Sequence, residues 1–112
     1  MNKLLLLLSI ILLSFNTIKE TKASYYAKEH HGKKTASGER FNMYDYTAAH
    51  RTLAFNTKVK VTNMDNNESI VVRINDRGPF IKSRDLDLSY AAFKSIANPK
   101  KGWIKIKYET IN

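Results

Sequence analysis

The sequence predicts a small barrel made mostly of β-strands, on three observations. Apolar and polar residues alternate in several short stretches, as in strands with one buried face and one wet face. Residues 90–97 have the spacing and the preceding cap of one short helix. The chain has 112 residues, which is enough for one domain with one core and too few for two. Five or six short strands with one helix are typical of a small closed barrel.

The N-terminus has the pattern of a secretory signal peptide. Lys3 precedes an almost wholly apolar run, residues 4–13, which is too short to span a bilayer. A small-residue cleavage site is expected at Thr21–Ala23, so residues 1–23 are predicted to be the signal and residues 24–112 the mature domain. An uncleaved N-terminal anchor is the alternative. We therefore expect an exported protein of the periplasm or cell envelope, with no stable membrane span after cleavage.

The charge balance is strongly basic, with a formal net charge of +9, and the chain contains no cysteine. A basic surface attracts polyanions, which could be nucleic acid, anionic lipid or a charged cell-wall polymer. The export signal argues against a nucleic-acid partner. Without cysteine the chain has no disulfide, no thiolate metal site and no lipid-modified cysteine, so a lipoprotein is not expected. The domain must be held together by its core alone.

The first half of the mature chain is predicted to contain one short strand and a long polar loop. Ser24–Ala27 is the strand, and residues 28–40 form the loop, in which Gly32 and Gly38 break regular structure. Residues 47–50 form a short extended or turn-like piece of uncertain type. Four apolar or aromatic residues are expected to pack beneath the loop: Phe41, Met43, Tyr44 and Tyr46.

The second half is predicted to begin with a β-hairpin. Residues 57–63 alternate lysine with valine, and residues 68–75 return as the antiparallel partner strand. Asn66-Asn67 closes this hairpin, because asparagine tolerates the left-handed backbone of tight turns.

A strand, a helix and a last strand are expected after the hairpin. Residues 85–88 form the strand, and Ser89 caps a helix over residues 90–97 that ends at Asn98-Pro99. In the last strand, residues 103–108, apolar residues alternate with lysines. Four aromatic residues are expected mainly in the core, with one or two as an alternative sugar-stacking surface: Tyr25, Tyr26, Trp103 and Tyr108.

Three residues at predicted turns are candidates for acid and base chemistry: Glu39, His50 and Asp76. Asp76 ends the strand of the hairpin and precedes the Gly78-Pro79 turn. If the three converge, a carboxylic acid could protonate a glycosidic oxygen while a second group takes a proton or stabilises the developing cation. The alternatives are structural: a turn for Asp76, a backbone hydrogen bond for Glu39, and a hydrogen-bonding role for His50.

Other polar residues are interpreted as structural. Asp87 is expected to accept from Arg77 or Arg84 rather than to act as a catalyst. His30 and His31 are neighbours whose side chains point to opposite sides of an extended chain, so no metal site is expected.

Five motifs in the mature chain resemble those of the rare lipoprotein A (RlpA) family and occur in the same order. They are TASGERF at 35–41, TAAHRTL at 47–53, VKVTN at 59–63, VVRINDRGPF at 71–80 and DLSYAA at 87–92. The likeness covers residues 24–109. It implies a six-stranded double-psi β-barrel, which is also the fold of expansins and barwin-like proteins. It also implies a peptidoglycan lytic transglycosylase, a lyase that needs no metal or cofactor.

The resemblance also implies roles for individual residues. Asp76 matches the catalytic acid and base of the family, and Glu39 and His50 match other catalytic groove residues. Neighbouring motif positions are implied to bind substrate: Thr35, Ser37, Thr47, Asn75 and Arg77. In the implied reaction, Asp76 protonates the oxygen between muramic acid and glucosamine. It then helps the muramic C6 hydroxyl attack C1, which leaves a 1,6-anhydro end.

The expected partner is the glycan strand of peptidoglycan, and the protein is expected to be a monomer. Many family members carry a lipobox cysteine and a peptidoglycan-binding SPOR domain, and this chain has neither. The alternative function is a non-catalytic peptidoglycan-binding or wall-loosening module, like the related expansins.

Overall fold

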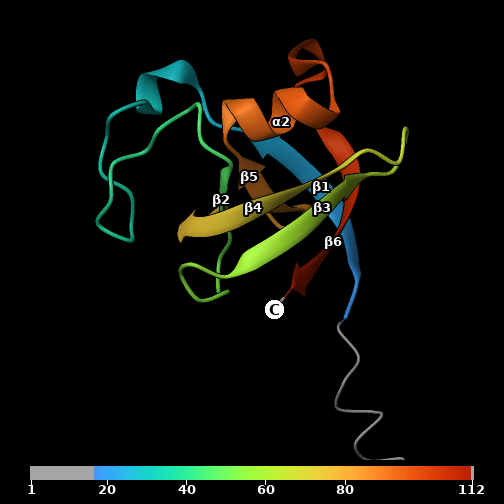
Figure 1. Ribbon diagram of the computed structural model, residues 1–112, viewed down its shortest axis with the longest axis horizontal. Coiled ribbons are helices and arrows are strands. Elements are labelled where there is room, and N and C mark those ends of the chain that lie inside the picture. Colours follow the sequence, from blue (N-terminus) through green and yellow to red (C-terminus); the bar gives the residue numbers. More distant parts are fainter. Residues whose placement is uncertain (1–16, 112) are drawn as a thin grey trace, which may run out of the picture.

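The computed structural model describes residues 17–111, in which six strands close into one barrel (Figure 1). The elements in chain order are β1 (Lys19–Tyr25), η1 (Lys28–His30), β2 (Thr47–Ala49), β3 (Lys58–Asn63), β4 (Ser69–Asp76), β5 (Arg84–Leu88), α2 (Tyr90–Ile96), η2 (Pro99–Lys101) and β6 (Ile104–Ile111). The elements η1 and η2 are single 3-10 turns. The prediction of a mostly β barrel with six strands and one short helix is confirmed.

The barrel order is β1-β5-β2-β4-β3-β6, so strands that are far apart in the sequence lie side by side. Strands β1 and β5 are parallel, as are β2 and β4, and the other neighbours are antiparallel. The predicted hairpin is confirmed as β3 and β4, with Val59 opposite Val72. Asn67 in its turn has a φ of 60°, the left-handed conformation expected there.

The core fills the barrel and extends beneath α2, which lies across one end of it (Figure 1). Ser89 caps this helix as predicted, because its Oγ accepts the N–H of Ala92 at 3.2 Å. The buried face of the helix consists of Ala92, Phe93 and Ile96. Several β-branched or leucine residues from the strands are almost fully buried with them: Val59, Val61, Val72, Ile74, Leu86, Leu88, Ile104 and Ile106.

Strand β1 begins five residues earlier than the predicted strand Ser24–Ala27, and that boundary was wrong. Ala23 is completely buried and lies between Leu86 of β5 and Ile104 of β6. The charged residues around it are exposed or half-buried, which hid the strand from a search for apolar alternation. The apolar part of the predicted signal lies outside the described residues. A cut after Ala23 would fall inside β1.

Two predictions about aromatic packing were wrong. Phe41 and Met43 are buried as expected, but Tyr44 is 69% exposed and Tyr46 is also exposed. Trp103 is 49% exposed rather than in the core. Residues 47–50, whose structure the sequence left open, provide the short strand β2. Within residues 17–111, no helix has the length and apolar character needed to cross a membrane.

Candidate functional site

Asp76 is the last residue of β4, and its carboxylate is held by three donors. Its Oδ1 accepts the backbone N–H groups of Ala36 and Arg77, each at 2.9 Å. Its Oδ2 accepts the hydroxyl of Tyr26 at 2.5 Å. Burial and the bond to Asp76 raise the pKa of Tyr26 far above its ordinary value, so this phenol stays a donor. Asp76 therefore acts only as an acceptor within the described structure.

A groove of about 350 Å³ opens at Asp76. Residues 25–27 and His30 form one side, residues 76–81 form another, and two residues of β5, Arg84 and Asp87, complete it. A hollow of about 370 Å³ on the β3–β6 side contains none of the predicted site residues. The groove is thus an open surface lined by residues of the sequence motifs at 71–80 and 87–92.

Asp87 lies in the same groove as Asp76, a juxtaposition that the sequence analysis missed. Its Oδ1 is 2.9 Å from Arg84 Nε, which confirms the predicted ion pair, although the N–H is not aimed at the oxygen. Burial raises the pKa of Asp87 above its ordinary value, with Arg84 opposing the rise. The presence of Asp87 in one of the five motifs was the signal that could have identified it.

Glu39 is tied into an ion pair beside the groove rather than left free. Arg73 donates to both of its carboxylate oxygens, at 3.1 and 2.8 Å, and Asn75 Nδ2 donates at 2.7 Å. These hydrogen bonds, that of Arg73 first, lower the pKa of Glu39 below its ordinary value. Glu39 therefore joins the loop to β4 through an ion pair and a hydrogen bond.

The predicted residues Thr35 and Ser37 support the same connection between the loop and β4 through hydrogen bonds. Thr35 Oγ1 donates to the carbonyl of Glu39 at 2.9 Å and lies 2.9 Å from Ser37 Oγ. The N–H of Ser37 donates to the carbonyl of Asn75 at 3.3 Å. Together these bonds fix the turn that presents the N–H of Ala36 to Asp76. The turn thus positions the catalytic candidate.

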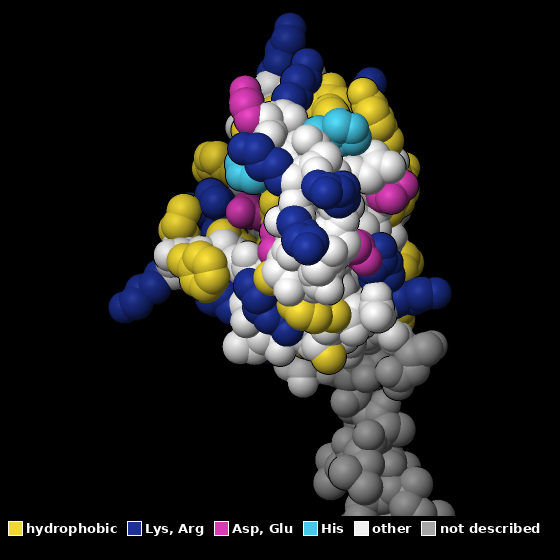
Figure 2. Space-filling model, turned by 90° about the vertical axis from the view of Figure 1, so that its left-hand side faces the viewer, with side chains coloured by type: hydrophobic (Ala, Val, Ile, Leu, Met, Phe, Trp, Pro, Cys, Tyr) yellow, Lys and Arg dark blue, Asp and Glu magenta, His cyan; other side chains and the backbone are white. Residues whose placement is uncertain are grey.

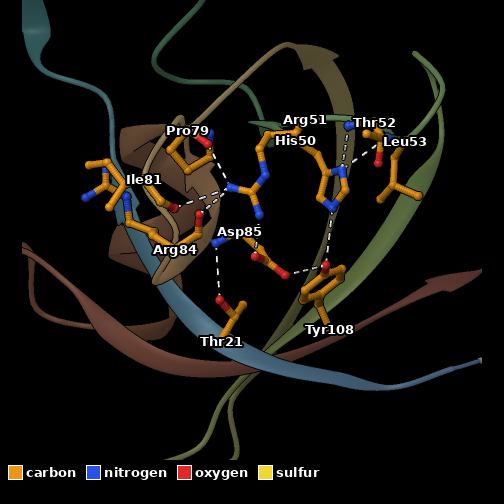
Figure 3. Close-up of polar contacts among 10 residues, drawn as sticks. All are labelled: Thr21, His50, Arg51, Thr52, Leu53, Pro79, Ile81, Arg84, Asp85 and Tyr108. Carbon is orange, nitrogen blue, oxygen red and sulfur yellow. Dashed lines mark hydrogen bonds and ion pairs between the residues drawn. The ribbon is translucent and has the colours of Figure 1, made fainter.

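The His50 side chain does not line the groove, although its backbone N–H donates to the Asp76 carbonyl at 3.2 Å. Its Nδ1 accepts the N–H groups of Thr52 and Leu53, at 3.1 and 3.0 Å, so the ring proton is on Nε2. Nε2 lies 3.2 Å from the hydroxyl of Tyr108 (Figure 3). Burial lowers the pKa of His50, and the imidazole is a neutral buried acceptor.

Arg51 connects this buried histidine cluster to the wall of the groove (Figure 3). Its Nη1 donates at 2.8 Å to the carbonyls of Pro79 and of Arg84. Its Nη2 donates at 2.7 Å to Asp85 Oδ1, and Tyr108 donates to Asp85 Oδ2 at 2.8 Å. The loop that follows Asp76 is therefore fastened at both of its ends. No sequence pattern predicted this contact set.

The ionisation of Asp85 supports this arrangement. Burial works to raise the pKa of Asp85, but hydrogen bonds from Tyr108 and Arg51 outweigh it and hold the pKa below its ordinary value. The Arg51–Asp85 pair is consequently charged over the whole neutral range.

Of two further predicted substrate-binding residues, Arg77 is held by other contacts and Thr47 is buried. The guanidinium of Arg77 donates to the carbonyls of His50 and Leu53, at 3.2 and 2.8 Å, and lies 4.0 Å from the Phe55 ring centre. Thr47 is buried, and its hydroxyl has no partner among the described residues. Across residues 17–111, no three His, Asp or Glu side chains are grouped as metal ligands.

A structural role for His50 gives a testable expectation. His50→Ala should lower the free energy of unfolding by about 1–3 kcal/mol, because the part-buried N–H groups of Thr52 and Leu53 lose their acceptor. His50→Asn should lose clearly less, since its Oδ1 can take the place of Nδ1. The lowered pKa means that wild-type stability is present above the ordinary histidine pKa and is lost as the pH falls through the folded value.

Urea unfolding of the three proteins between pH 4.5 and 7.5 measures these differences. His50→Asn should lack the acid loss that the histidine causes. Equal destabilisation by Ala and Asn at pH 7.5 would contradict the acceptor role.

The chain matches the family model described as "Lytic transglycolase" over residues 18–108. It is 54% identical over 85 residues to the endolytic peptidoglycan transglycosylase RlpA of Helicobacter pylori strain J99, covering 76% of this chain and 27% of that protein. The RlpA of Vibrio cholerae is 51% identical over 90 residues, covering 80% of this chain and 34% of that protein. The chain thus spans about a third or less of these relatives.

Two solved structures have the same fold at low sequence identity. The Streptomyces papain inhibitor is 21% identical with a TM-score of 0.72, covering 86% of this chain and 96% of that one. An expansin of Clavibacter michiganensis is 19% identical with a TM-score of 0.70, covering 86% of this chain and 51% of that one. At these identities the likeness concerns the barrel alone.

Proposed function

We propose, from the premise that this chain belongs to the RlpA family of lytic transglycolases with a double-psi β-barrel, that it cleaves the glycan strands of peptidoglycan. The bond cut is the β-1,4 bond between N-acetylmuramic acid and N-acetylglucosamine, and the product is a 1,6-anhydromuramic end. The family resemblance seen in the sequence is confirmed. The activity is carried over from relatives that are longer than this chain.

The observation that carries the proposal is the presence of two carboxyl groups in one open groove. Asp76 accepts three hydrogen bonds, and Asp87 has a raised pKa. Glycosidic bond cleavage needs a proton donor at the leaving oxygen and a stabiliser for the cation that develops at C1. Two carboxyl groups in different environments can divide these roles.

We assign the proton donor to Asp87 and charge stabilisation to Asp76. Asp87 gives its proton to the glycosidic oxygen, and the bond from this oxygen to C1 of the muramic sugar breaks. The Asp76 carboxylate, fixed by Tyr26 and two backbone N–H groups, stabilises the positive charge at C1. The C6 hydroxyl then attacks C1 and passes its proton to the Asp87 carboxylate, which regenerates the acid.

The other predicted catalytic residues support this pair without touching the reacting atoms. Glu39 fixes the turn that donates Ala36 N–H to Asp76, and His50 fixes the backbone at the start of the segment that contains Arg51. Both are positioning residues in this proposal. The division differs from the sequence prediction, which gave both proton steps to Asp76.

The surface charge suits an anionic wall polymer. Lys and Arg side chains are spread over the face shown in Figure 2, with acidic and hydrophobic side chains between them. Peptidoglycan carries carboxylates on its stem peptides, so a basic surface concentrates the enzyme on its substrate. The proposal includes action outside the cytoplasm, after export, as a monomer and without a cofactor.

Product analysis tests the function directly. The purified protein is incubated with intact and with peptide-stripped sacculi, and the soluble products are identified by mass spectrometry. We expect 1,6-anhydromuramic ends. Reducing ends would show a hydrolase that uses water, and would contradict the transglycosylase reaction.

A non-catalytic glycan-binding or wall-loosening module is the second candidate. It is favoured by the ion pair between Arg84 and Asp87, because Arg84 opposes the rise in the Asp87 pKa and favours the charged form, which cannot donate a proton. Folded protein that sediments with sacculi and releases no product would establish this second function.

A further inference from the structure

Phe80 is the most exposed large apolar side chain among the described residues, at 82%. It lies four residues after Asp76 in the loop that forms one wall of the groove. Ile81 beside it is 49% exposed, so the loop presents two adjacent apolar side chains to solvent next to the two carboxyl groups, a placement that marks a binding surface.

The loop holds Phe80 in a defined place. Arg51 is hydrogen bonded to the carbonyls of Pro79 and Arg84, on either side of Phe80 (Figure 3). Gly78 has a φ of +120°, which only glycine adopts readily, and a side chain there would lie 3.6 Å from the Phe80 ring. The loop therefore turns sharply after Asp76, and the phenyl ring lies directly over the turn.

We infer that Phe80 is a saccharide platform, on which one N-acetylhexosamine ring of a glycan strand stacks while the adjoining glycosidic bond lies at Asp76 and Asp87. The inference rests on the proposed function and names a binding residue for it. The face of a pyranose ring carries C–H groups, which pack well on the electron-rich face of an aromatic ring. The carboxylates and the Tyr26 hydroxyl in the same groove supply polar partners for sugar hydroxyls.

In this arrangement Arg51 is a positioning residue. It reaches the loop only through backbone carbonyls, so it contributes to sugar binding by fixing Phe80. The charged Asp85 and the hydroxyl of Tyr108 hold the guanidinium in turn. The basic and apolar neighbours Lys82 and Ile81 make a membrane surface the competing partner for Phe80.

The test measures binding of the purified protein to peptide-free glycan strands, by cosedimentation, for Phe80→Ala, Phe80→Trp and a matched control. Tyr44→Ala is the control, because Tyr44 is also an exposed aromatic residue and does not line the groove. Phe80→Ala should weaken binding about tenfold. Phe80→Trp should stay close to wild type, and Tyr44→Ala should not change binding. Wild-type affinity of Phe80→Ala, or equal losses for Phe80→Ala and Tyr44→Ala, would overturn the inference.

A double-mutant cycle tests the role of Arg51. Arg51→Met should weaken glycan binding in the wild-type background and should have a clearly smaller effect in the Phe80→Ala background, because its contribution passes through the phenyl ring. Each variant is first checked for an unchanged thermal transition, and Arg51→Lys replaces Arg51→Met if the latter fails to fold. Independent, additive effects would remove Arg51 from the inference.

Two further comparisons separate the possible failures. Because binding and product release are measured separately, a wild-type protein that yields no anhydro product but loses affinity on Phe80→Ala would refute the proposed function and support the platform. A protein that cleaves glycan, and whose Phe80→Ala variant binds glycan normally, would refute the platform alone. If Phe80→Ala lost binding to anionic lipid vesicles but bound glycan as the wild type does, Phe80 would be a membrane contact and the inference would be overturned.

Discussion

Asp76→Asn and Asp87→Asn should each reduce the release of anhydromuramic products by a factor of about 10² to 10⁴, the usual contribution of a positioned acid or base. Asparagine keeps the shape of each side chain but cannot transfer a proton or carry the charge. Both variants should keep the barrel fold. Asp65→Asn is the matched control, because Asp65 is an exposed carboxylate near Lys101, outside the groove, and this variant should cleave normally.

The pH profile separates the roles of the two carboxyl groups. The pKa of Asp87 is raised by burial, so the acid form exists below that value and is lost as the pH rises through it. The rate of product release should therefore fall on the alkaline side in the wild type, and the residual activity of Asp87→Asn should lack this fall. If Asp76→Asn alone removed the alkaline fall, the proton donor would be Asp76, as the sequence motifs implied.

The same raised pKa predicts a stability effect. A group whose pKa is higher in the folded state stabilises the fold at low pH and loses that contribution as the pH rises through the folded value. Asp87→Asn should therefore melt at the wild-type temperature or above at pH 7. A clearly lower melting temperature would mean that the ion pair with Arg84 stabilises the folded protein more than burial of the Asp87 carboxylate destabilises it.

A protein that begins at Ser24 should fail to form the barrel. Lys19–Ala23 contains all the residues of β1 that pair with β6, and Ala23, the last of them, is completely buried. Removing them leaves two strands with unpaired edges and opens the core, a loss comparable to the whole stability of a small domain, about 5–15 kcal/mol. Circular dichroism should show a cooperative thermal transition for a chain that begins at Thr17 and none for one that begins at Ser24.

The natural N-terminus tests the same point in the cell. If export removes a signal, mass spectrometry of the exported protein should find a first residue before Lys19. A mature protein that begins at Ser24 and melts like the longer chain would contradict the role of β1.

Local patterns were sufficient to predict the second half of the fold. The hairpin of β3 and β4, the Ser89 cap and the last strand each depend on neighbours in the sequence, and each was found. Strand β1 was misplaced because its lysines face outward and its buried residue is an alanine. Its pairing with β5 and β6 depends on residues more than 60 positions away, which no local pattern encodes.

The site was predictable as a set of motifs but not as an arrangement of side chains. Asp76 was identified from the end of a strand and the turn that follows, and the structure places it in the groove. The orientation of His50 could not be inferred, because it depends on a register shift after Ala48 and on acceptor bonds to Thr52 and Leu53. The connection from Arg51 to the groove wall joins separate segments of the chain and likewise has no local signature.

The position of β1 between β5 and β6 also governs when the chain can fold. The first strand has no partner until residues 84–111 are available, so the barrel closes only after nearly the whole chain has left the ribosome or the export channel. Such long-range pairing makes folding slow compared with local hairpin formation. If the chain is exported as we propose, this strand order favours an unfolded chain until its last strands are released.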